Sequence, residues 1–399
     1  MQSANLKIYL TKLFFLLVLI LISAPAYSEG FNADFEDGIT YRSENKEFSF
    51  KLGGRLHYDG AYFEEDQENL ESDWLVRRMR LALRVNFFTD WRISGQYKLN
   101  VDEEPIKSLF LRYSGFEKTQ LMFGQMEEPF GLEKSTSSNN ITFMERAMPD
   151  VLGPGTSIGF AVRRWGDNWS GGGGLFWDTY IEDKDRLSSQ AERGLTARFT
   201  TAPRYYKKQR VHLGISGSSR LPSERARVRM RTRSETKVTD EKLVSTGWIK
   251  EVDSYHTGAL EAAIIFYALS LQGEYTRTFV STQQDSESRN EVFDGYYIYM
   301  SLLLTGGSRS YSVKSGAFDG IKTRGGAGAW EIGFRQSNLN LNSIVGDVLG
   351  GEQTNYTLGL NWYPHQSVRF MLNYIQVGTD MNAGNDDPKF VQFRTQIAI

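Results

Sequence analysis

The chain has 399 residues, with 46 basic and 48 acidic side chains, a formal net charge of −2 and mean hydropathy of −0.42. It contains no cysteine and only four histidines, which excludes disulfide bonds and thiol chemistry and argues against a zinc or haem site. We expect no metal, no cofactor and no nucleic-acid partner. Its 38 glycines and many aromatic residues, against nine prolines, favour extended structure.

Residues 1–28 are predicted to be a secretion signal. Lys7 and Lys12 precede an apolar stretch at 13–22 that is too short to span a bilayer, and the small residues up to Ser28 resemble a signal-peptidase site. Without this segment 44 basic and 48 acidic residues remain, a net charge of −4. No later run of about 18 apolar residues occurs, which excludes an ordinary inner-membrane protein.

The first strands show strict alternation of apolar and polar residues. From Phe48 to Tyr58 the apolar residues occupy one face. From Arg78 to Phe87 one face is apolar and the other carries Arg78, Arg80 and Arg84, and a tight turn at Thr89-Asp90 leads to a partner strand. A soluble sandwich can alternate in this way too. The repetition along the chain, with aromatic residues near strand ends and a basic inner face, favours lipid as the apolar solvent.

Fourteen further segments have strand character, which makes about seventeen with the first three: 106–115, 118–125, 157–165, 168–178, 192–201, 210–219, 224–233, 256–266, 268–280, 291–305, 327–337, 353–364, 366–377 and 389–399. Bacterial single-chain barrels have an even number of strands. We therefore predict that residues 29–399 form one all-β domain, an antiparallel transmembrane β-barrel of about 16 strands with in-folded extracellular loops. One of the seventeen candidates is therefore not a wall strand, and we expect it to be 224–233, because its apolar face would make poor contact with lipid.

That segment carries arginine at every second position. In an extended chain these side chains project from one face about 6.5–7 Å apart, while Ala226, Val228, Met230 and Thr232 line the other face. A solvated edge strand or a patch for anionic lipopolysaccharide would fit this pattern. A conduction path for anions fits it as well, with residues 220–255 as an extracellular loop folded into the lumen. The arginines concerned are Arg225, Arg227, Arg229, Arg231 and Arg233.

A second long insertion lies at residues 126–155, and strand counting makes it the third extracellular connection. If this connection folds inward, it narrows the pore and forms a constriction loop. The acidic run from Glu64 to Asp73 is expected to be a solvated outer loop.

Several segments resemble the phosphate-selective porin family, the outer-membrane porins O and P. They are spread in order over nearly all of the mature chain: KEFSFKLGGRLHYD (46–59), WLVRRMRL (74–81), FGLEKSTSS (130–138), ITFMER (141–146), WEIGFR (330–335) and LGLNWYPHQSVRFMLNY (358–374). The resemblance implies a homotrimer of sixteen-stranded barrels in which an arginine ladder leads anions to a constriction with a phosphate-binding lysine.

Site residues follow from this resemblance by motif. Arg225, Arg227 and Arg229 match the start of the ladder, which Arg231 and Arg233 continue. Arg77 and Arg78 match a paired arginine near the constriction, Arg55 in GGRL matches another lining arginine, and Lys134 in GLEK matches the central lysine. Arg80 shares the inward face of its strand. A loop salt bridge with Glu133 or Glu128 is the alternative for Lys134.

Three residues depart from the family pattern. Lys107 stands where phosphate-specific members carry an acidic residue, and Asn139 stands where relatives often have a basic one. Ile399 ends the chain where an aromatic residue is common. The first two departures concern the choice of anion.

The function predicted from these observations is an anion-selective porin of the Gram-negative outer membrane, surrounded by lipid and lipopolysaccharide, that lets phosphate or polyphosphate diffuse passively through an arginine-lined channel. A general anion or oligosaccharide porin without phosphate preference is the alternative. An outer-membrane enzyme needs a nucleophile beside a base, and no G-x-S-x-G motif occurs. No catalytic residue is predicted.

Overall fold

The computed structural model describes residues 30–35, 38–100, 105–177, 186–188, 192–222, 224, 226–284, 287–322, 327–343, 345–381 and 384–399. The predicted secretion signal and Arg225 lie outside these residues. Within the described ranges the helices are the single turn α2 (Leu132–Ser135) and the 3-10 helix η1 (Met148–Leu152), and no helix there is long and apolar enough to cross a membrane.

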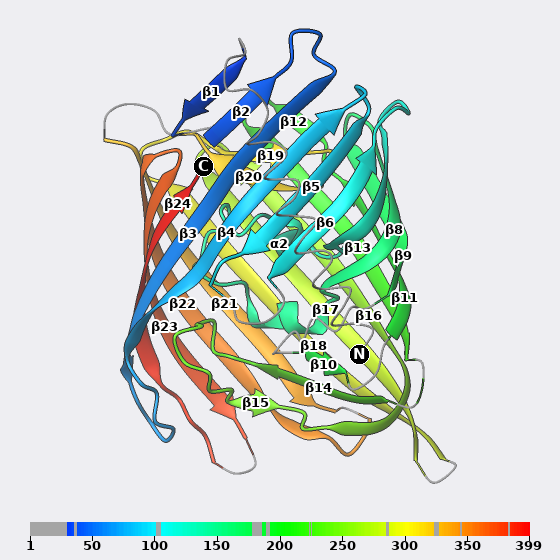
Figure 1. The fold of residues 1–399 in the computed structure, drawn as a ribbon. Helices are drawn as coiled ribbons and strands as arrows, with labels where there is room; N and C mark the ends of the chain where they lie inside the picture. Colours follow the sequence, from blue (N-terminus) through cyan, green and yellow to red (C-terminus); the bar gives the residue numbers. More distant parts are fainter. Residues whose placement is uncertain are drawn as a thin grey trace.

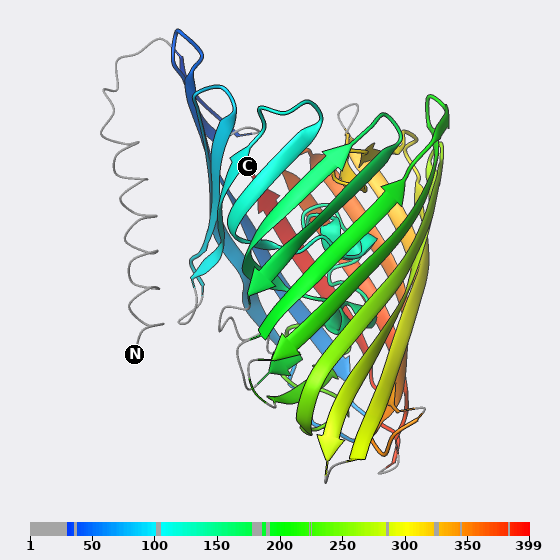
Figure 2. The ribbon, with the colours of Figure 1, turned by 90° about the vertical axis from the view of Figure 1, so that its right-hand side faces the viewer.

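Sixteen antiparallel strands form a closed ring, in which β24 pairs back onto β3 (Figures 1 and 2). The prediction of an antiparallel barrel of about 16 strands is confirmed. The wall strands in order are β3 (Phe48–Glu64), β4 (Asp73–Phe87), β5 (Trp91–Lys98), β6 (Ile106–Tyr113), β7 (Thr119–Glu127), β8 (Thr156–Trp165), β9 (Trp169–Trp177), β11 (Glu192–Thr201), β13 (Gln209–Pro222), β16 (Ile249–Phe266), β17 (Leu269–Gln284), β18 (Glu287–Leu303), β21 (Ala329–Asn342), β22 (Leu349–His365), β23 (Val368–Asp380) and β24 (Lys389–Ala398).

Side-chain burial alternates along these strands as the sequence pattern requires. In β16 the outward residues Leu260, Ile264 and Phe266 are exposed, whereas the inward residues Thr257 and Glu261 are buried. Apolar side chains thus face outward to lipid, and polar ones face the lumen, which is the arrangement of a transmembrane barrel.

The two ends of the barrel differ in the length of their connections. At the upper end of Figure 1 most links are short, and the first contains Phe88 and Thr89 with φ of 49° and 64°. Because barrels of this type have short periplasmic turns and longer extracellular loops, the upper end is periplasmic. The C-terminus lies there, as does the hairpin of β1 (Phe31–Asp34) and β2 (Gly38–Arg42), in which β2 pairs with β3.

Two extracellular connections fold into the lumen. The first, 128–155, carries α2 and η1. The second, 223–248, carries β14 (Ala226–Thr232) and β15 (Val244–Ser245), and β14 also pairs with β10 (Arg186–Ser188) and with the outer end of β16. β13 and β16 extend further than expected, so this connection is shorter at both ends than the predicted 220–255.

The apolar face of β14 is buried inside the cylinder. Ala226, Val228 and Met230 are fully buried in a cluster with η1 and with inward-facing residues of the wall. The cluster partners include Met148, Leu152, Val280, Phe293 and Leu339. The segment of alternating arginines that includes β14, called the ribbon below, therefore lies in the bore of the barrel. Its arginine-bearing face is turned away from this cluster.

A periplasmic connection also turns inward. Residues 304–328 contain the hairpin of β19 (Arg309–Ser312) and β20 (Ala317–Ile321), whose Phe318 packs against Leu132, Ala263 and Ile265. The sequence pattern did not predict this hairpin. Since Leu132 belongs to α2, the segments that enter from the two ends of the barrel meet inside it.

Replacing Val228 by Asp should detach β14 from the wall, because burying a polar group without a partner costs roughly 2–7 kcal/mol. We expect proteinase K to cut the connection 223–248 in the detergent-solubilised variant while the barrel strands stay protected, as read by mass spectrometry. Arg229→Ser changes the opposite face of β14 and serves as the control that keeps its protection. Equal protection of Val228→Asp and the native protein would contradict the packing.

Candidate functional site

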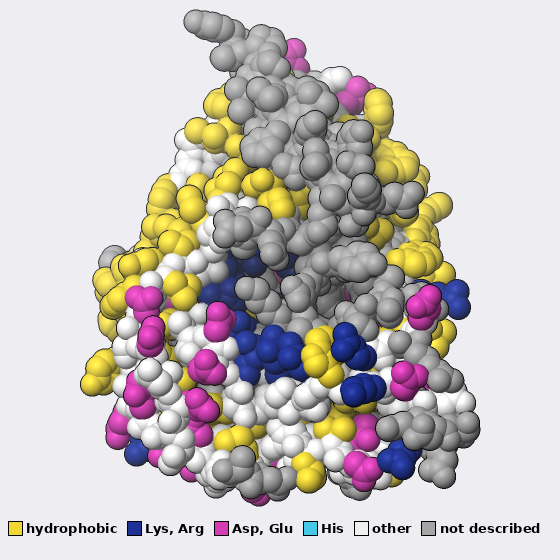
Figure 3. Space-filling model, turned by 60° about the horizontal axis from the view of Figure 1, so that its bottom comes forward, with side chains coloured by type: hydrophobic (Ala, Val, Ile, Leu, Met, Phe, Trp, Pro, Cys, Tyr) yellow, Lys and Arg dark blue, Asp and Glu magenta, His cyan; other side chains and the backbone are white. Residues whose placement is uncertain are grey.

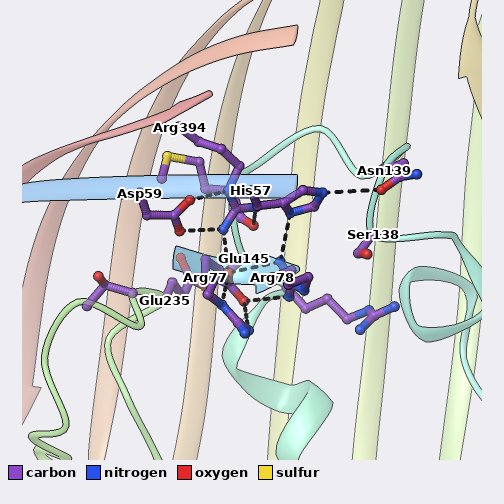
Figure 4. A network of polar contacts seen from close by, with 12 residues as sticks. His57, Asp59, Arg77, Arg78, Ser138, Asn139, Glu145, Glu235 and Arg394 are labelled. Atoms are coloured by element: carbon purple, nitrogen blue, oxygen red, sulfur yellow. Dashed lines mark hydrogen bonds and ion pairs between the residues drawn. The ribbon is translucent and has the colours of Figure 1, made fainter. Parts of the chain in front are cut away.

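Glu145 attaches the connection 128–155 to the barrel wall. Its carboxylate accepts hydrogen bonds from Arg77 at 2.8 and 2.9 Å, from Arg78 at 3.3 and 3.4 Å and from Arg394 at 2.6 Å (Figure 4). Arg394, on β24, also contacts Asp59, on β3, at 2.6 and 2.7 Å. Three guanidinium groups from two strands thus converge on one loop carboxylate, and Asp59 offsets part of their charge.

A β-bulge brings two consecutive arginines to this carboxylate. His57 faces Arg78 and the next residue, Tyr58, faces Val76, so Arg77 is the extra residue of β4. Simple alternation would turn Arg77 toward lipid. The bulge re-aims it into the lumen.

The charge state of Glu145 follows from this environment. Burial by itself would raise the pKa of its carboxyl, but Arg77, Arg78 and Arg394 hold that pKa well below its ordinary value. Glu145 is therefore ionised throughout the range in which the protein works.

Arg335 of β21 connects both in-folded loops to the wall. It donates to Glu235 of the connection 223–248 at 2.6 Å, lies 3.5 Å from the carboxylate of Glu133, and its guanidinium stands 4.5 Å from the ring centre of Phe143. It is fully buried. One cation thereby fixes the relative position of the two segments that narrow the lumen.

Arg55 and Arg80 stand on the wall beside the constriction loop. Arg55 donates to Ser138 at 3.0 Å, and both arginines interact electrostatically with Glu127 and Arg146. Neither forms an ion pair among the described residues.

The ribbon of arginines approaches the same region from the extracellular side. Arg227 is exposed, Arg229 and Arg231 are partly exposed, and Arg233 is buried and pairs with Asp240 at 2.5 Å. The guanidinium groups of Arg227 and Arg229 lie 5.4 and 4.6 Å from the ring centre of Trp248. Beside Arg233 of the ribbon is a cavity of about 170 Å³ lined by both loops and the wall, including Arg77, Arg146 and Lys237.

The extracellular face shows how charge is sorted. In Figure 3 the lysine and arginine side chains gather in the middle of this face, and aspartate and glutamate side chains are spread around it. Basic side chains thus lie inside a ring of acidic ones at this end of the barrel. No group of three or more residues able to hold a metal ion occurs in the described ranges.

Comparison with known proteins identifies the family of the chain. The family described as "Phosphate-selective porin O and P" matches residues 50–399. The chain belongs to this family. Porin O of Pseudomonas aeruginosa is 26% identical over 420 residues, covering 92% of this chain and 93% of that protein. The predicted family is thus confirmed, and with it an outer-membrane channel rather than an enzyme.

Solved structures share the fold at low identity. An anion-selective porin from Comamonas acidovorans has a TM-score of 0.57 at 13% identity, with coverage of 88% of this chain and all of that one. The outer-membrane channel DcaP of Acinetobacter baumannii has a TM-score of 0.56 at 10% identity, covering 90% and 99%. At this level of identity the likeness concerns the barrel alone.

Lys134 of this porin contacts the backbone of its own loop. Its ammonium donates to the carbonyl groups of Asp150, Gly153 and Pro154 at 3.0, 3.4 and 2.8 Å, and lies 3.4 Å from the Asp150 carboxylate. The acidic partner of Lys134 is thus Asp150, and not Glu133 or Glu128, which the sequence offered as alternatives. In this conformation Lys134 fastens α2 to the segment after η1.

The structure also places the two departures from the family pattern that concern the choice of anion. The side-chain oxygen of Asn139 lies 3.2 Å from Nε2 of His57, from which it can accept a hydrogen bond. Lys107 donates to the hydroxyl of Thr156, at the start of the wall strand that follows the constriction loop. Asn139 belongs to the constriction loop itself, whereas Lys107 is on β6 and contacts the first residue after the loop.

A second group of cations lines the periplasmic half of the wall, and apart from Arg84 its members were not singled out as site residues from the sequence. Arg112 interacts electrostatically with Arg84, Arg92 and Arg163, and Lys314 of the periplasmic hairpin joins them. Arg92 and Arg112 are cross-strand partners on β5 and β6. Assigning the inward-facing positions of β6 from the alternation of its residues, as for β5, would have found this pair. Positive charge therefore continues past the constriction.

Protonation of Glu133 couples the loop to pH. Burial raises the pKa of its carboxyl to about 7, although Arg335 favours the charged form. In the unfolded chain the proton leaves near the ordinary value of 4.5. The folded protein thus binds the extra proton between these values, so the stability contributed by this group falls as pH rises from 4.5 to about 7.

Glu133→Gln keeps the neutral form at every pH. We expect native and variant proteins to unfold at similar temperatures in detergent at pH 5, and the native protein to be less stable at pH 8 by an amount on the order of 3 kcal/mol. Glu65→Gln, in the exposed outer connection, is the matched control without this divergence. A variant that is less stable than the native protein at pH 8 would refute the assignment.

Proposed function

We propose that this porin conducts phosphate and related small anions by passive diffusion along a basic path. The observation that supports it most directly is the division of the lumen arginines. Those that hold the loops have buried carboxylate partners, whereas Arg55, Arg80 and Arg84 have no ion-pair partner among the described residues. These unbalanced charges lie between the ribbon and the periplasmic cations.

The chemistry of arginine suits such a path. A guanidinium presents five donors in a planar fork that pairs with phosphate, and it stays charged at any relevant pH. Conduction requires sites that attract an ion but release it to a neighbour. In our proposal the ribbon, through Arg225, Arg227, Arg229, Arg231 and Arg233, draws anions inward, and Arg55 and Arg80 receive them beside the constriction loop.

Arg77, Arg78 and Lys134 have a different part in the proposal. Glu145 neutralises part of the charge of the two arginines, so they contribute mainly the positive field of the wall. Direct contact of Lys134 with phosphate requires its ammonium to leave the three carbonyl groups that it now contacts. In this proposal the residues that conduct anions lie next to the residues that attach the constriction loop to the wall.

A general anion porin without phosphate preference is the second candidate. The satisfied ammonium of Lys134, together with Lys107 in place of an acidic residue, favours it. Titration of the chloride current with phosphate in planar bilayers separates the candidates. Block at low phosphate concentration supports the first, and equal currents for all small anions support the second.

Replacing both Arg227 and Arg229 by Glu should weaken phosphate block by about tenfold or more, because one hydrogen bond to a charged group contributes about 1.5–3 kcal/mol. The reversal potential in a KCl gradient should move toward cation preference. Arg193→Glu makes the same change on the outer side of β11, where Leu195 and Phe199 face outward, and should leave both measurements unchanged. Unaltered selectivity in the double variant would remove the ribbon from the path.

We also propose that the porin assembles as a homotrimer in outer-membrane lipid and lipopolysaccharide. A trimer form is described for OmpT of Vibrio cholerae, which has a TM-score of 0.54 at 8% identity. Native mass spectrometry of the protein extracted in mild detergent should report three copies. A mass of one or two copies under conditions that preserve other porin trimers would contradict this proposal.

A further inference from the structure

The wall of the lumen contains a pocket that differs in character from the rest of the basic path. It has a volume of about 210 Å³ and lies between the start of the constriction loop and the periplasmic ends of β6, β7 and β8. Its lining combines apolar and charged side chains: Phe110, Met122, Met126 and Ala161 with Lys107, Arg112, Glu127 and Arg163.

The apolar part is unusual because barrel interiors are polar. Met122, Met126 and Ala161 are inward-facing residues of β7 and β8, and they form a cluster with Phe176 against which Phe110 packs. Packing of the loop covers only some of this surface, since the cavity remains open beside Phe110 and Met122. Methionine and aromatic side chains form an adaptable surface for apolar groups.

Two cations stand at the edge of this surface. Within the described part of the chain neither Arg112 nor Arg163 has an ion-pair partner, and the guanidinium of Arg112 lies 5.4 Å from the ring centre of Phe110. The Nε of Arg112 is buried without a hydrogen-bond partner. A buried donor of this kind is costly unless something accepts its hydrogen bond.

We propose that this pocket is a subsite for small anions that carry an apolar group, such as aryl or short alkyl monoesters of phosphate. The anionic group would contact Arg112 and Arg163, and the apolar group would lie on Phe110 and Met122. An apolar cavity of about 150 Å³ accepts a benzene ring, so the space is sufficient for a phenyl group beside its phosphate. The proposal rests on the anion conduction proposed above, and it adds a preference for amphiphilic anions over purely polar ones.

The test compares two monoesters of similar charge, phenyl phosphate and glycerol phosphate, as blockers of the chloride current through the mature protein in planar bilayers. In the native protein phenyl phosphate should block at about one tenth of the concentration required for glycerol phosphate, because burying an aromatic ring strengthens binding by at least this factor. Equal block by the two monoesters would overturn the proposal.

Variants assign the preference to the pocket. Phe110→Gln with Met122→Gln should abolish the preference for phenyl phosphate, whereas Phe110→Leu with Met122→Leu should keep most of it. A preference that persists in the glutamine variant would place the apolar contact elsewhere and overturn the proposal. If the glutamine variant does not insert, the comparison of the native protein and the leucine variant with both monoesters still decides.

Inorganic phosphate block and the reversal potential in KCl are measured on the same channels. They report the basic path itself, and we expect them to be unchanged in both double variants. If these two measurements show anion preference while the monoesters block equally, the subsite fails and the proposed function stands. If they show no anion preference, the proposed function fails.

Discussion

The interior of this porin depends on the rule that a buried charge needs a partner. Glu145 brings Arg77, Arg78 and Arg394 together, and Arg335 does the same for carboxylates of the two in-folded connections. Removing Glu145 would be strongly destabilising because it would leave three largely buried positive charges without their shared carboxylate. The constriction is therefore fixed by ion pairs inside the barrel, and the hydrogen bonds of the wall alone would not place it.

The same rule separates two kinds of arginine along one surface. On β4, Arg77 and Arg78 contact Glu145, whereas Arg84 is exposed to the lumen only a few residues further on. Residues of identical chemistry thus act as fasteners or as parts of the proposed path, according to whether a carboxylate lies beside them. The periplasmic hairpin repeats the arrangement, since Arg309 pairs with Glu331 while Lys314 is exposed.

Much of the wall could be predicted from period-2 alternation, because lipid on one side and water on the other impose it on every strand. The strand predicted at 192–201 has the same bounds in the structure. β16 begins at Ile249, seven residues before its predicted start. Its extracellular end pairs with β14 outside the lipid-facing part of the strand, where alternation of apolar and polar residues is no longer required.

The interior was harder to predict because it is specified by contacts between distant residues. The bulge at Arg77 adds a single residue to β4, and nothing in the amino-acid composition of the strand indicates it. The hairpin at 309–321 is polar and glycine-containing, like many solvated loops, and its inward turn depends on contacts such as that of Tyr311 with His212. The GLEK motif drew attention to Lys134, but it could not show the carbonyl groups that this lysine contacts, which lie up to twenty positions away.

Trp248 holds two arginines of the ribbon in place without adding negative charge, which a carboxylate could not do. Its indole ring lies against the guanidinium groups of both Arg227 and Arg229, so it restrains two long, flexible side chains through the attraction between a cation and an aromatic face. An acidic residue in that place would restrain them equally well but would cancel positive charge at the entrance. An uncharged anchor orders the two arginines without itself cancelling any of their positive charge.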